Sequence, residues 1–315
     1  CEITGDCPPW RIESSKIKHD KNKKQLIYEN SILKVYDLPI FYFPKFFHPD
    51  PTVKRQSGFL IPNLSDSGNT GTSLSIPYFK VLAVNKDLTF KPRLFTNRNL
   101  FIQNEYRHIE KNLDHIMDVG LFTSELSNNS EQSKSHFFSN TIINFEKNMF
   151  DNSNLEINLE QVSNDTYLKK FKPSSELIDN ENLMHNYLKF DGYNEDSSFS
   201  ILLESYEDLT KDSNDRYEYI YPDISYNKEF TNSSFPGKFN LSSDLYQKQF
   251  ETNKYTQSLV TSLIYNSPTK FNEKGIVEDF QILFKNPNKI NKTGSNSESN
   301  SETKLLSKLM YTLSY

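Results

Sequence analysis

The chain of 315 residues lacks the short motifs that mark common enzymes. It contains no G-x-S-x-G nucleophile elbow, no H-E-x-x-H metal-binding helix and no phosphate-binding loop. The sequence Gly68-Asn69-Thr70-Gly71 has no lysine after it and predicts a hairpin turn instead. Carboxylates are abundant, but the sequence alone pairs no two of them. We therefore predict that the chain is not an enzyme and uses no cofactor.

Cysteine is scarce and occurs only at Cys1 and Cys7. A metal site would need further Cys or His residues at ligand spacing, and none is nearby. The histidines lie on separate candidate strands, which favours structural or loop roles over a metal site: His108, His115, His136 and His185. We expect disulfide bonding in an oxidising compartment, either between the two cysteines or with partners elsewhere.

The sequence also lacks a long apolar run, a signal peptide and an excess of positive charge. No apolar stretch approaches the ~20 residues of a membrane-spanning helix. A net charge of −5 argues against nucleic acid as a partner, because nucleic-acid binding needs a basic surface. The chain opens on Cys1 instead of Met and reaches Tyr315 inside an alternating pattern, so we expect an internal fragment of a longer protein.

Aromatic residues are plentiful, at 14% of the chain, and they are densest between Leu38 and Pro62. This stretch also carries five prolines, each of which removes a backbone donor, so it predicts neither a helix nor a central strand. We predict an extended connector at a domain boundary. This connector ends in a small pivot at Ser57-Gly58.

Alternation of apolar and polar residues decides the predicted fold class. Trp10–Tyr36 predicts a pair of strands around a turn at His19–Asn22. Downstream, period-two alternation predicts strands at Leu100–Ile109, Leu113–Leu121, Leu155–Glu160, Phe239–Leu245 and Leu309–Tyr315. Polar stretches between the strands predict loops at Ser127–Ser135, Asp191–Ser198, Asp208–Asp215 and Asn286–Glu302. The fold is therefore predicted to be all-β.

Two all-β architectures fit this pattern. A soluble sandwich, propeller or solenoid buries its apolar faces against one another. A transmembrane barrel turns its apolar face to lipid, keeps a polar lumen and joins its strands by short turns and long outer loops. Very polar alternate positions and uneven loops favour the barrel. In a barrel the stripe formed by Tyr217, Tyr219 and Tyr221 would be an interfacial girdle.

Several segments resemble the LptD family of lipopolysaccharide-assembly outer-membrane proteins, also called organic solvent tolerance proteins. They are P-I-F-Y-F-P, H-P-D-P-T-V-K-R-Q-S-G-F-L-I-P, S-I-P-Y-F and D-L-T-F-K-P-R, with P-P-W and I-K-H-D upstream. The resemblance runs from Cys1 to about Ile109; beyond it only barrel-like alternation remains. That family has a periplasmic β-jellyroll followed by a large barrel that releases lipopolysaccharide sideways into the outer leaflet.

The resemblance implies a division of the chain and a set of partners. Residues 1–48 would be the C-terminal strands of the periplasmic jellyroll, and 59–315 the N-terminal, incomplete part of an outer-membrane antiparallel β-barrel. Residues 49–58 would be the hinge between them, with Pro49, Pro51, Ser57 and Gly58 as its hinge residues. Implied partners are lipopolysaccharide, outer-membrane lipids, a plug lipoprotein (LptE-like) and a periplasmic bridge protein (LptA-like). The implied location is the outer membrane, with the N-terminal part in the periplasm.

The resemblance also implies site residues. Pro62 and Pro77 match prolines near the seam between first and last strands, and a strand proline weakens pairing because it cannot donate a ladder bond. We therefore expect a lateral gate there. Cys1 matches a cysteine that pairs near the far end of the barrel, whereas Cys7 departs from the pattern, so the pairing stays open. Lys54 and Arg55 are candidates for contact with acidic lipid head groups.

Two other functions stay open from the residues. A general porin or nutrient transporter would carry rings of lumen charge and no jellyroll. A soluble or surface-anchored β-rich binding protein would extract without detergent.

Overall fold

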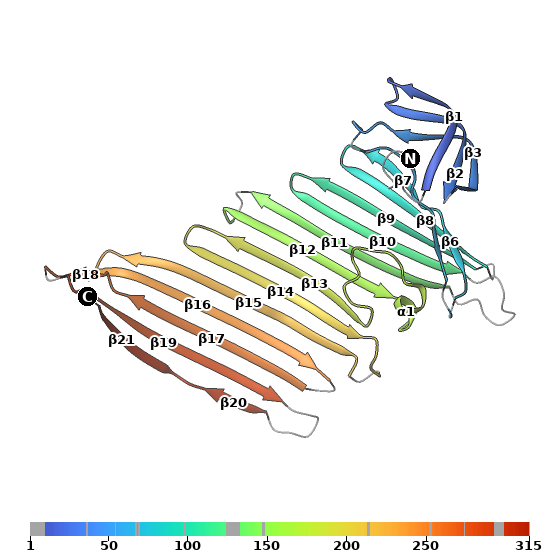
Figure 1. Ribbon diagram of the computed structural model, residues 1–315. Coiled ribbons are helices and arrows are strands. Elements are labelled where there is room, and N and C mark those ends of the chain that lie inside the picture. The colour runs from blue at the N-terminus through green and yellow to red at the C-terminus, as the bar shows by residue number, and fades with distance from the viewer. Residues whose placement is uncertain are drawn as a thin grey trace. The chain divides into compact units, whose positions relative to one another are not determined.

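The computed structural model describes residues 10–35, 37–53, 55–66, 68, 70–96, 99–123, 133–146, 149–212, 215–251, 254–273, 275–292 and 299–314. Within these ranges nearly every element is a strand (Figure 1). In chain order they are β1 (Trp10–Asp20), β2 (Gln25–Val35), β3 (Leu38–Pro49), β4 (Gly58–Phe59), β5 (Asn63–Ser65), β6 (Ser73–Ser75), β7 (Tyr78–Ala83), β8 (Lys86–Phe95), β9 (Leu100–Glu110), β10 (Leu113–Thr123), β11 (Lys134–Glu146), β12 (Asn152–Val162), α1 (Tyr167–Phe171), β13 (Leu183–Tyr193), β14 (Ser197–Asp208), β15 (Tyr217–Asn232), β16 (Phe235–Phe250), β17 (Lys254–Asn266), β18 (Lys270–Phe271), β19 (Val277–Lys292), β20 (Asn300–Thr303) and β21 (Leu306–Ser314). The all-β prediction is confirmed.

The chain divides into two compact units, one of Cys1–Gly58 with Phe79–Val81 and one of Phe59–Tyr78 with Leu82–Tyr315. In the first unit β1, β2 and β3 form one antiparallel sheet. The Asp20 carboxylate closes the turn between β1 and β2 by accepting hydrogen bonds from the backbone N–H groups of Asn22 and Lys23. The predicted strand pair between Trp10 and Tyr36 is thus observed, with its turn slightly later than predicted.

The first part of the predicted connector is a strand, so that prediction was wrong for residues 38–49. β3 pairs along β2 from Val35↔Leu38 to Gln25↔Pro49, and the Tyr28 and Phe46 rings stack at 4.5 Å. The prolines are tolerated because β3 is an edge strand of this three-stranded sheet. On an edge strand, N–H groups that point away from the neighbour need no ladder partner.

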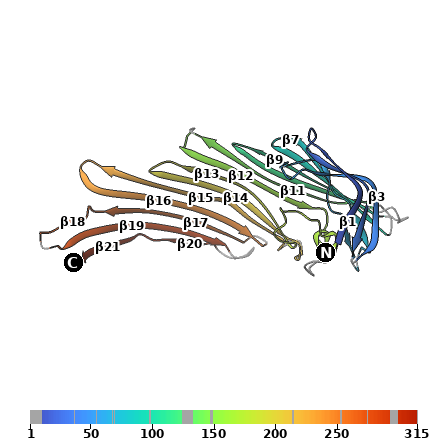
Figure 2. The ribbon, with the colours of Figure 1, turned by 45° about the horizontal axis from the view of Figure 1, so that its top comes forward.

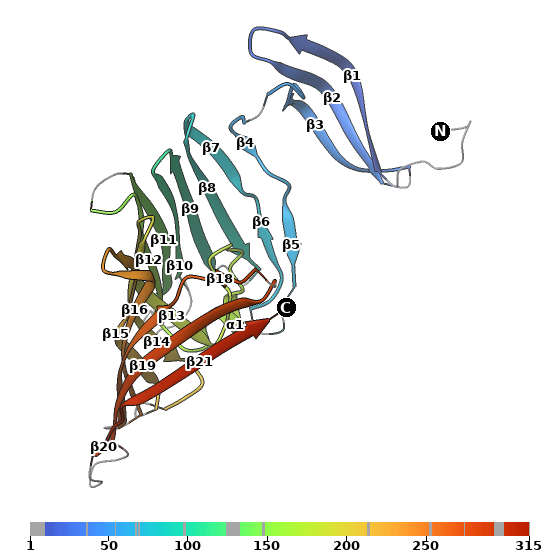
Figure 3. The ribbon, with the colours of Figure 1, turned by 90° about the vertical axis from the view of Figure 1, so that its left-hand side faces the viewer.

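In the second unit each long strand pairs antiparallel with its neighbour in sequence, from β5–β6 and β6–β8 through to β17–β19 and β19–β21. The strand order is that of a barrel in which β21 and β4 meet at the seam. The sheet is strongly curved, as Figures 2 and 3 show. The short strands β18 and β20 flank the ends of β19.

Two polar stretches predicted as loops are largely strand. β19 continues to Lys292 because Asn286 and Asn288 pair with Thr261 and Leu259 of β17, so the loop prediction for 286–292 was wrong. Between β13 and β14 only residues 194–196 form a turn. Polar residues do not end these strands, since ladder bonds join backbone groups and form whatever side chain a residue carries.

The two faces of this sheet differ in an unusual way. The registers place one set of apolar side chains on a face that is open, and many are at least one third exposed: Leu64, Leu74, Leu94, Leu121, Phe137, Leu159, Leu188, Leu259, Phe284 and Leu309. The opposite face carries the polar residues of the same strands, several of which are buried: Thr89, Gln103, Glu105, Asp118, His136, Asn158 and Glu204. We call these the outer and the inner face. A soluble sheet buries its apolar face, whereas this one exposes it.

The connections between strands are mostly shorter at one end of the sheet than at the other. Residues 84–85, 111–112 and 233–234 join strands at the first end, although residues 267–276 there form a longer connection that contains β18. Residues 163–182 and 209–216 are long connections at the second end, whereas 96–99 and 251–253 are short ones. Short turns on one side and long loops on the other are typical of outer-membrane barrels. Among the described residues, no helix has the length and apolar character needed to cross a membrane.

Candidate functional site

Pro62 and Pro77 lie where the first hairpin of the second unit is interrupted. Residues 60–62 separate β4 from β5, and residues 76–77 separate β6 from β7. The backbone N–H of Leu60 donates to the carbonyl oxygen of Pro77 at 2.8 Å, and the rings of Phe59 and Tyr78 meet edge to face at 5.1 Å. A proline nitrogen has no hydrogen to donate, so each ring removes a ladder donor at an interruption.

A cavity of about 410 Å³ opens beside Pro77. It is lined by apolar, neutral polar and cationic residues: Leu60, Ile61, Asn63, Ser75, Pro77, Lys91, Arg93, Phe101, Gln103 and Ser174. The two cations come from β8, where the strand alternation turns both toward the inner face. Ile61 is 87% exposed, so the apolar side of the cavity is open.

The two cations have different partners. Lys91 Nζ lies 2.7 Å from Glu105 Oε2 and also donates to the carbonyl oxygen of Ser174 at 2.8 Å. Arg93 donates from Nη1 to the carbonyl oxygen of Phe171 at 2.6 Å, and its guanidinium lies 5.5 Å from the centre of the Phe101 ring. Within the described part of the chain, Arg93 forms no ion pair with a carboxylate. Its positive charge therefore faces neutral acceptors.

The backbone oxygens that accept from these cations belong to residues 163–182, which we call the inward segment. This segment joins β12 to β13 and folds over the inner face (Figure 3). It contains α1, whose side chains Tyr167, Leu168 and Phe171 are buried. They pack in one cluster with Phe95, Phe101, Phe122 and Phe138 of the inner face and with Met184 near the start of β13. An apolar patch on an otherwise polar face thus explains why the segment docks there.

A buried polar chain lies beneath the same segment. His136 Nε2 lies 3.1 Å from Asp118 Oδ1, and the Tyr167 hydroxyl lies 2.9 Å from His136 Nδ1. Gln103 Nε2 donates to Asp118 Oδ2 at 2.7 Å. The His136 and Asp118 side chains are fully buried. Because Asp118 accepts, a neutral His136 carries its proton on Nε2 and accepts from Tyr167 at Nδ1. These hydrogen bonds therefore link α1 to the strands β9, β10 and β11.

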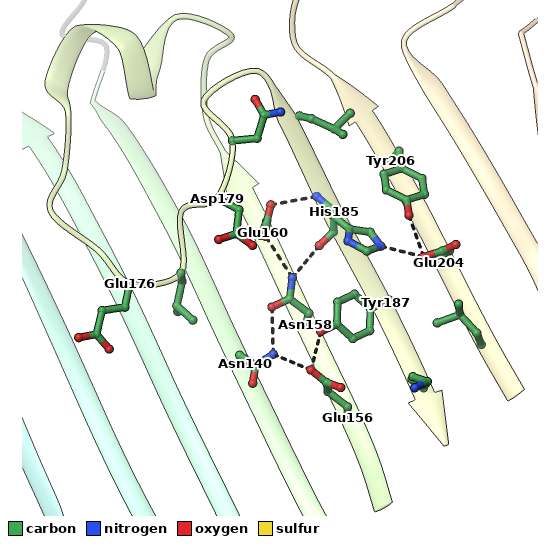
Figure 4. Close-up of a pocket in the computed structure, with 15 residues that line it drawn as sticks. Asn140, Glu156, Asn158, Glu160, Glu176, Asp179, His185, Tyr187, Glu204 and Tyr206 are labelled. Carbon is green, nitrogen blue, oxygen red and sulfur yellow. Dashed lines mark hydrogen bonds and ion pairs between the residues drawn. The ribbon is translucent and has the colours of Figure 1, made fainter. Parts of the chain in front are cut away.

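A second, larger cavity of about 550 Å³ lies farther along the inner face, between β11 and β14 (Figure 4). Its carboxylates include Glu156, Glu160, Glu176, Asp179 and Glu204. Several are held by neighbouring side chains: Tyr187 donates to Glu156 at 2.5 Å, Tyr206 donates to Glu204 at 3.0 Å, and His185 Nε2 lies 2.8 Å from Glu204. This wall is polar and acidic, as expected for a surface that faces water.

The predicted hinge residues lie between the sheet of the first unit and the first barrel strand. Pro49 ends β3 and Pro51 lies in the turn that follows. The Ser57 hydroxyl accepts a hydrogen bond from the backbone N–H of Val81 at 2.9 Å, and Gly58 begins β4. The division between the two units falls directly after Gly58.

The candidates for head-group contact and disulfide bonding are only partly described. Cys1, Cys7 and Lys54 lie outside the described residues. Arg55 lies over the Phe79 ring at 6.0 Å. The four histidines do fall on separate strands, β9, β10, β11 and β13, as the sequence indicated.

Sequence reasoning missed the residues that line the cavity and hold the inward segment. Lys91 and Arg93 alternate with Phe90 and Pro92 on β8, and this period-two pattern was a usable signal for an inner face. No pattern in the sequence indicated that Phe171 and Ser174 would meet them, because that contact joins positions about 80 residues apart.

Taken together, these features define the class of protein. An antiparallel sheet in barrel order has an exposed apolar face, a polar inner face and connections that are mostly shorter at one end. This is the arrangement of an outer-membrane β-barrel.

Curated relatives refine this class. The chain is similar to the LPS-assembly protein LptD of Shewanella oneidensis, with 39% identity over 107 residues, which cover 33% of this chain and 14% of the relative. LptD of Psychrobacter cryohalolentis is 34% identical over 34% of the chain and 11% of its own length. LptD of Polaromonas sp. is 26% identical over 53% of the chain and 20% of its own length. No family model matches the sequence.

The chain thus contains an LptD-like segment, and it spans between one ninth and one fifth of the length of these relatives. The resemblance noted from the sequence is confirmed.

Proposed function

We propose that the chain takes part in lipopolysaccharide assembly as part of an outer-membrane barrel. Its similarity to LptD proteins supports this, and the observation that carries it is the exposed apolar face opposite a buried polar face. Such a sheet is stable only where lipid covers the apolar side. We further propose that the chain works without covalent chemistry, by shape and by a weak seam.

The weak seam is the proposed lateral gate at Pro62 and Pro77. In lipid an unsatisfied backbone group costs several kcal/mol, so a broken hairpin is tolerated there only where its opening has a use. The interruptions around both prolines support the gate, since pairing between β4–β5 and β6–β7 is discontinuous there. Lipid would leave sideways between the first and last strands.

The parts of the chain would have separate roles. We propose that residues 1–48 end a periplasmic jellyroll, that 49–58 are the hinge and that 59–315 belong to the barrel. The partners would be lipopolysaccharide, outer-membrane lipids, an LptE-like plug lipoprotein and an LptA-like bridge protein. Lys54 and Arg55 would contact acidic head groups. Cys1 or Cys7 would form a disulfide, and a Cys1→Ser variant running unchanged on a non-reducing gel would count against a long-range bond at Cys1.

The test is photo-crosslinking in the intact protein in cells, with a photoreactive residue in place of Tyr78. The matched control replaces Leu188, which is exposed on the outer face of β13, as far from the end of its strand as Tyr78 is from the end of β7, and many strands from the seam. We expect a lipopolysaccharide adduct at position 78 that disappears when lipid supply is blocked, and little adduct at 188.

Equal adducts at both positions would contradict the gate, because they would report surrounding lipid. No lipopolysaccharide adduct at any barrel position would contradict the function itself. That result, with solute uptake through the protein, would favour a porin, and extraction without detergent would favour a soluble binding protein.

A further inference from the structure

Arg93 differs from three other arginines of the chain in the kind of partner that its guanidinium contacts. The arginines Arg11, Arg107 and Arg216 each form ion pairs with carboxylates. Arg93 is half-buried on the inner face and, within the described residues, has only backbone carbonyls and the Phe101 ring as partners. Buried charges are normally paired, because transfer from water is costly. Arg93 therefore has capacity for an anion.

The cavity around Arg93 also contains no carboxylate among its lining residues. This is notable in a chain with net charge −5, and it contrasts with the acidic second cavity on the same face. The positive charge of Lys91 is neutralised in part by Glu105 on the neighbouring strand β9. The uncompensated positive charge is thus concentrated at Arg93.

The rest of the cavity is amphipathic. Leu60, Ile61 and Pro77 form an apolar wall on the hairpin side, and Ser75, Asn63 and Gln103 supply neutral polar groups. A ligand that fits must carry an anion at one end and apolar matter at the other. A free phosphate would use only the cationic part of this space.

We propose that Arg93, assisted by Lys91, binds a phosphate group of an amphipathic lipid whose apolar part lies against Leu60 and Ile61. The guanidinium fork matches phosphate geometry and gives charge-assisted hydrogen bonds, which are roughly twice as strong as bonds between neutral groups. The identification of the ligand as a lipid rests on the proposed function, whereas the preference for an anion rests on the residues that line the cavity.

Binding would compete with the inward segment. Arg93 now donates to the Phe171 carbonyl oxygen, and Lys91 donates to that of Ser174. A phosphate oxygen is the stronger acceptor, so its arrival takes these donors from the segment. The site is therefore also a point where a lipid loosens the contact between the inward segment and β8.

The experiment uses intact protein in detergent micelles, with a photoreactive residue in place of Ile61 and lipid A bearing both phosphates as the probe. We expect an adduct that falls about tenfold in Arg93→Gln, equivalent to ~1.4 kcal/mol. The matched control is Arg107→Gln, on the inner face of the neighbouring strand but paired with Asp87 at 2.9 Å, and there we expect no loss. Lipid A without phosphates is expected to label as weakly as the Arg93→Gln protein.

Each other result has one meaning. Wild-type labelling that Arg93→Gln leaves unchanged, or equal labelling by phosphate-free lipid A, overturns the inference alone. Inorganic phosphate that displaces the probe at millimolar concentration would show a free-anion site and overturn the lipid assignment. No adduct at Ile61 in the otherwise unchanged protein overturns the inference, and the proposed function falls with it only if no barrel position gives a lipopolysaccharide adduct in cells. If Arg93→Gln does not assemble, Arg93→Lys replaces it as the test. This variant keeps the positive charge, so it must still label more strongly with phosphorylated lipid A than with the phosphate-free form.

Discussion

The backbone N–H of Leu60 donates to the carbonyl oxygen of Pro77 at 2.8 Å, across the stretch where both strands of the first hairpin are interrupted. The bond shows that the two segments stay side by side although β5–β6 ladder pairing ends at Asn63↔Ser75. The hairpin that borders the seam with β21 is thus held together but weakly paired, and this supports the proposed gate at that seam.

The double substitution Pro62→Ala and Pro77→Ala tests this weakness. It restores a backbone donor at each position, and each new bond contributes about 1 kcal/mol. We expect slower appearance of newly made lipopolysaccharide at the cell surface, measured by pulse labelling, with unchanged heat-modifiable migration of the barrel. The control is Pro92→Ala, on the continuous strand β8. Equal slowing by Pro92→Ala, or none by the double variant, would contradict the gate.

The contact between Gly120 and His136 gives a second prediction. A Cβ at Gly120 would lie 2.3 Å from His136 Cε1 and 3.0 Å from the Tyr167 hydroxyl, so Gly120→Ala must displace the buried ring. Overpacking of this kind costs about 1–3 kcal/mol. We expect a lower denaturation midpoint in urea. Gly58→Ala, where no atom lies within 4 Å of the new Cβ, should change the midpoint little; an equal loss there would show a general sensitivity to added methyl groups.

His136 itself gives a third prediction. His136→Leu leaves the Tyr167 hydroxyl without its acceptor and removes one of the two donors to the buried Asp118 carboxylate. An unmet buried polar group costs about 1–3 kcal/mol, so we expect the inward segment to loosen. Limited proteolysis between residues 163 and 182 should become faster. His115→Leu is the control, because His115 bonds Thr141 away from α1; unchanged cleavage in His136→Leu would show that the apolar cluster alone holds the segment.

The sequence was sufficient for some strands but not for those whose pairing depends on distant surroundings. Alternation at Leu113–Leu121 and Leu155–Glu160 located β10 and β12, because period two depends only on which face each side chain occupies. It failed at Leu38–Pro49, where five prolines between Leu38 and Pro62 argued against pairing, because an edge position cannot be inferred from local composition. It failed again at Asn286–Lys292, because ladder bonds join backbone groups and form whatever the polarity of the side chains.

The role of Pro62 and Pro77 as a gate stays a prediction. These two residues could be singled out in advance because the resemblance matched them to prolines near the seam, where the loss of a backbone donor weakens pairing. Arg93 could not, because its significance is the lack of a carboxylate partner among the described residues, and that depends on which distant segment folds over it. Long-range contacts of this kind leave no local trace in the sequence.

The ion pair between Arg216 and Asp165 gives a prediction of pH dependence for the inward segment. Arg216 donates to both oxygens of Asp165, at 3.0 and 2.7 Å, and so ties the start of the segment to the residue just before β15. These hydrogen bonds hold the pKa of the Asp165 carboxyl below its ordinary value of 3.8. A carboxyl with a lowered pKa in the folded protein contributes stability that is present above its unfolded pKa and is lost as the pH falls through the folded value.

We therefore expect the inward segment to stay equally protected from proteases between pH 8 and 5, and to become sensitive to pepsin only below pH 3.8. Asp165→Asn removes this ion pair at every pH, so its cleavage should be faster throughout and should lose part of the acid dependence. The control is Asp212→Asn, in the connection between β14 and β15 that Arg216 also ends. If cleavage depends on pH in the same way in Asp165→Asn and in the unchanged protein, protonation of Asp165 is not what releases the segment. Another titrating group must then be responsible.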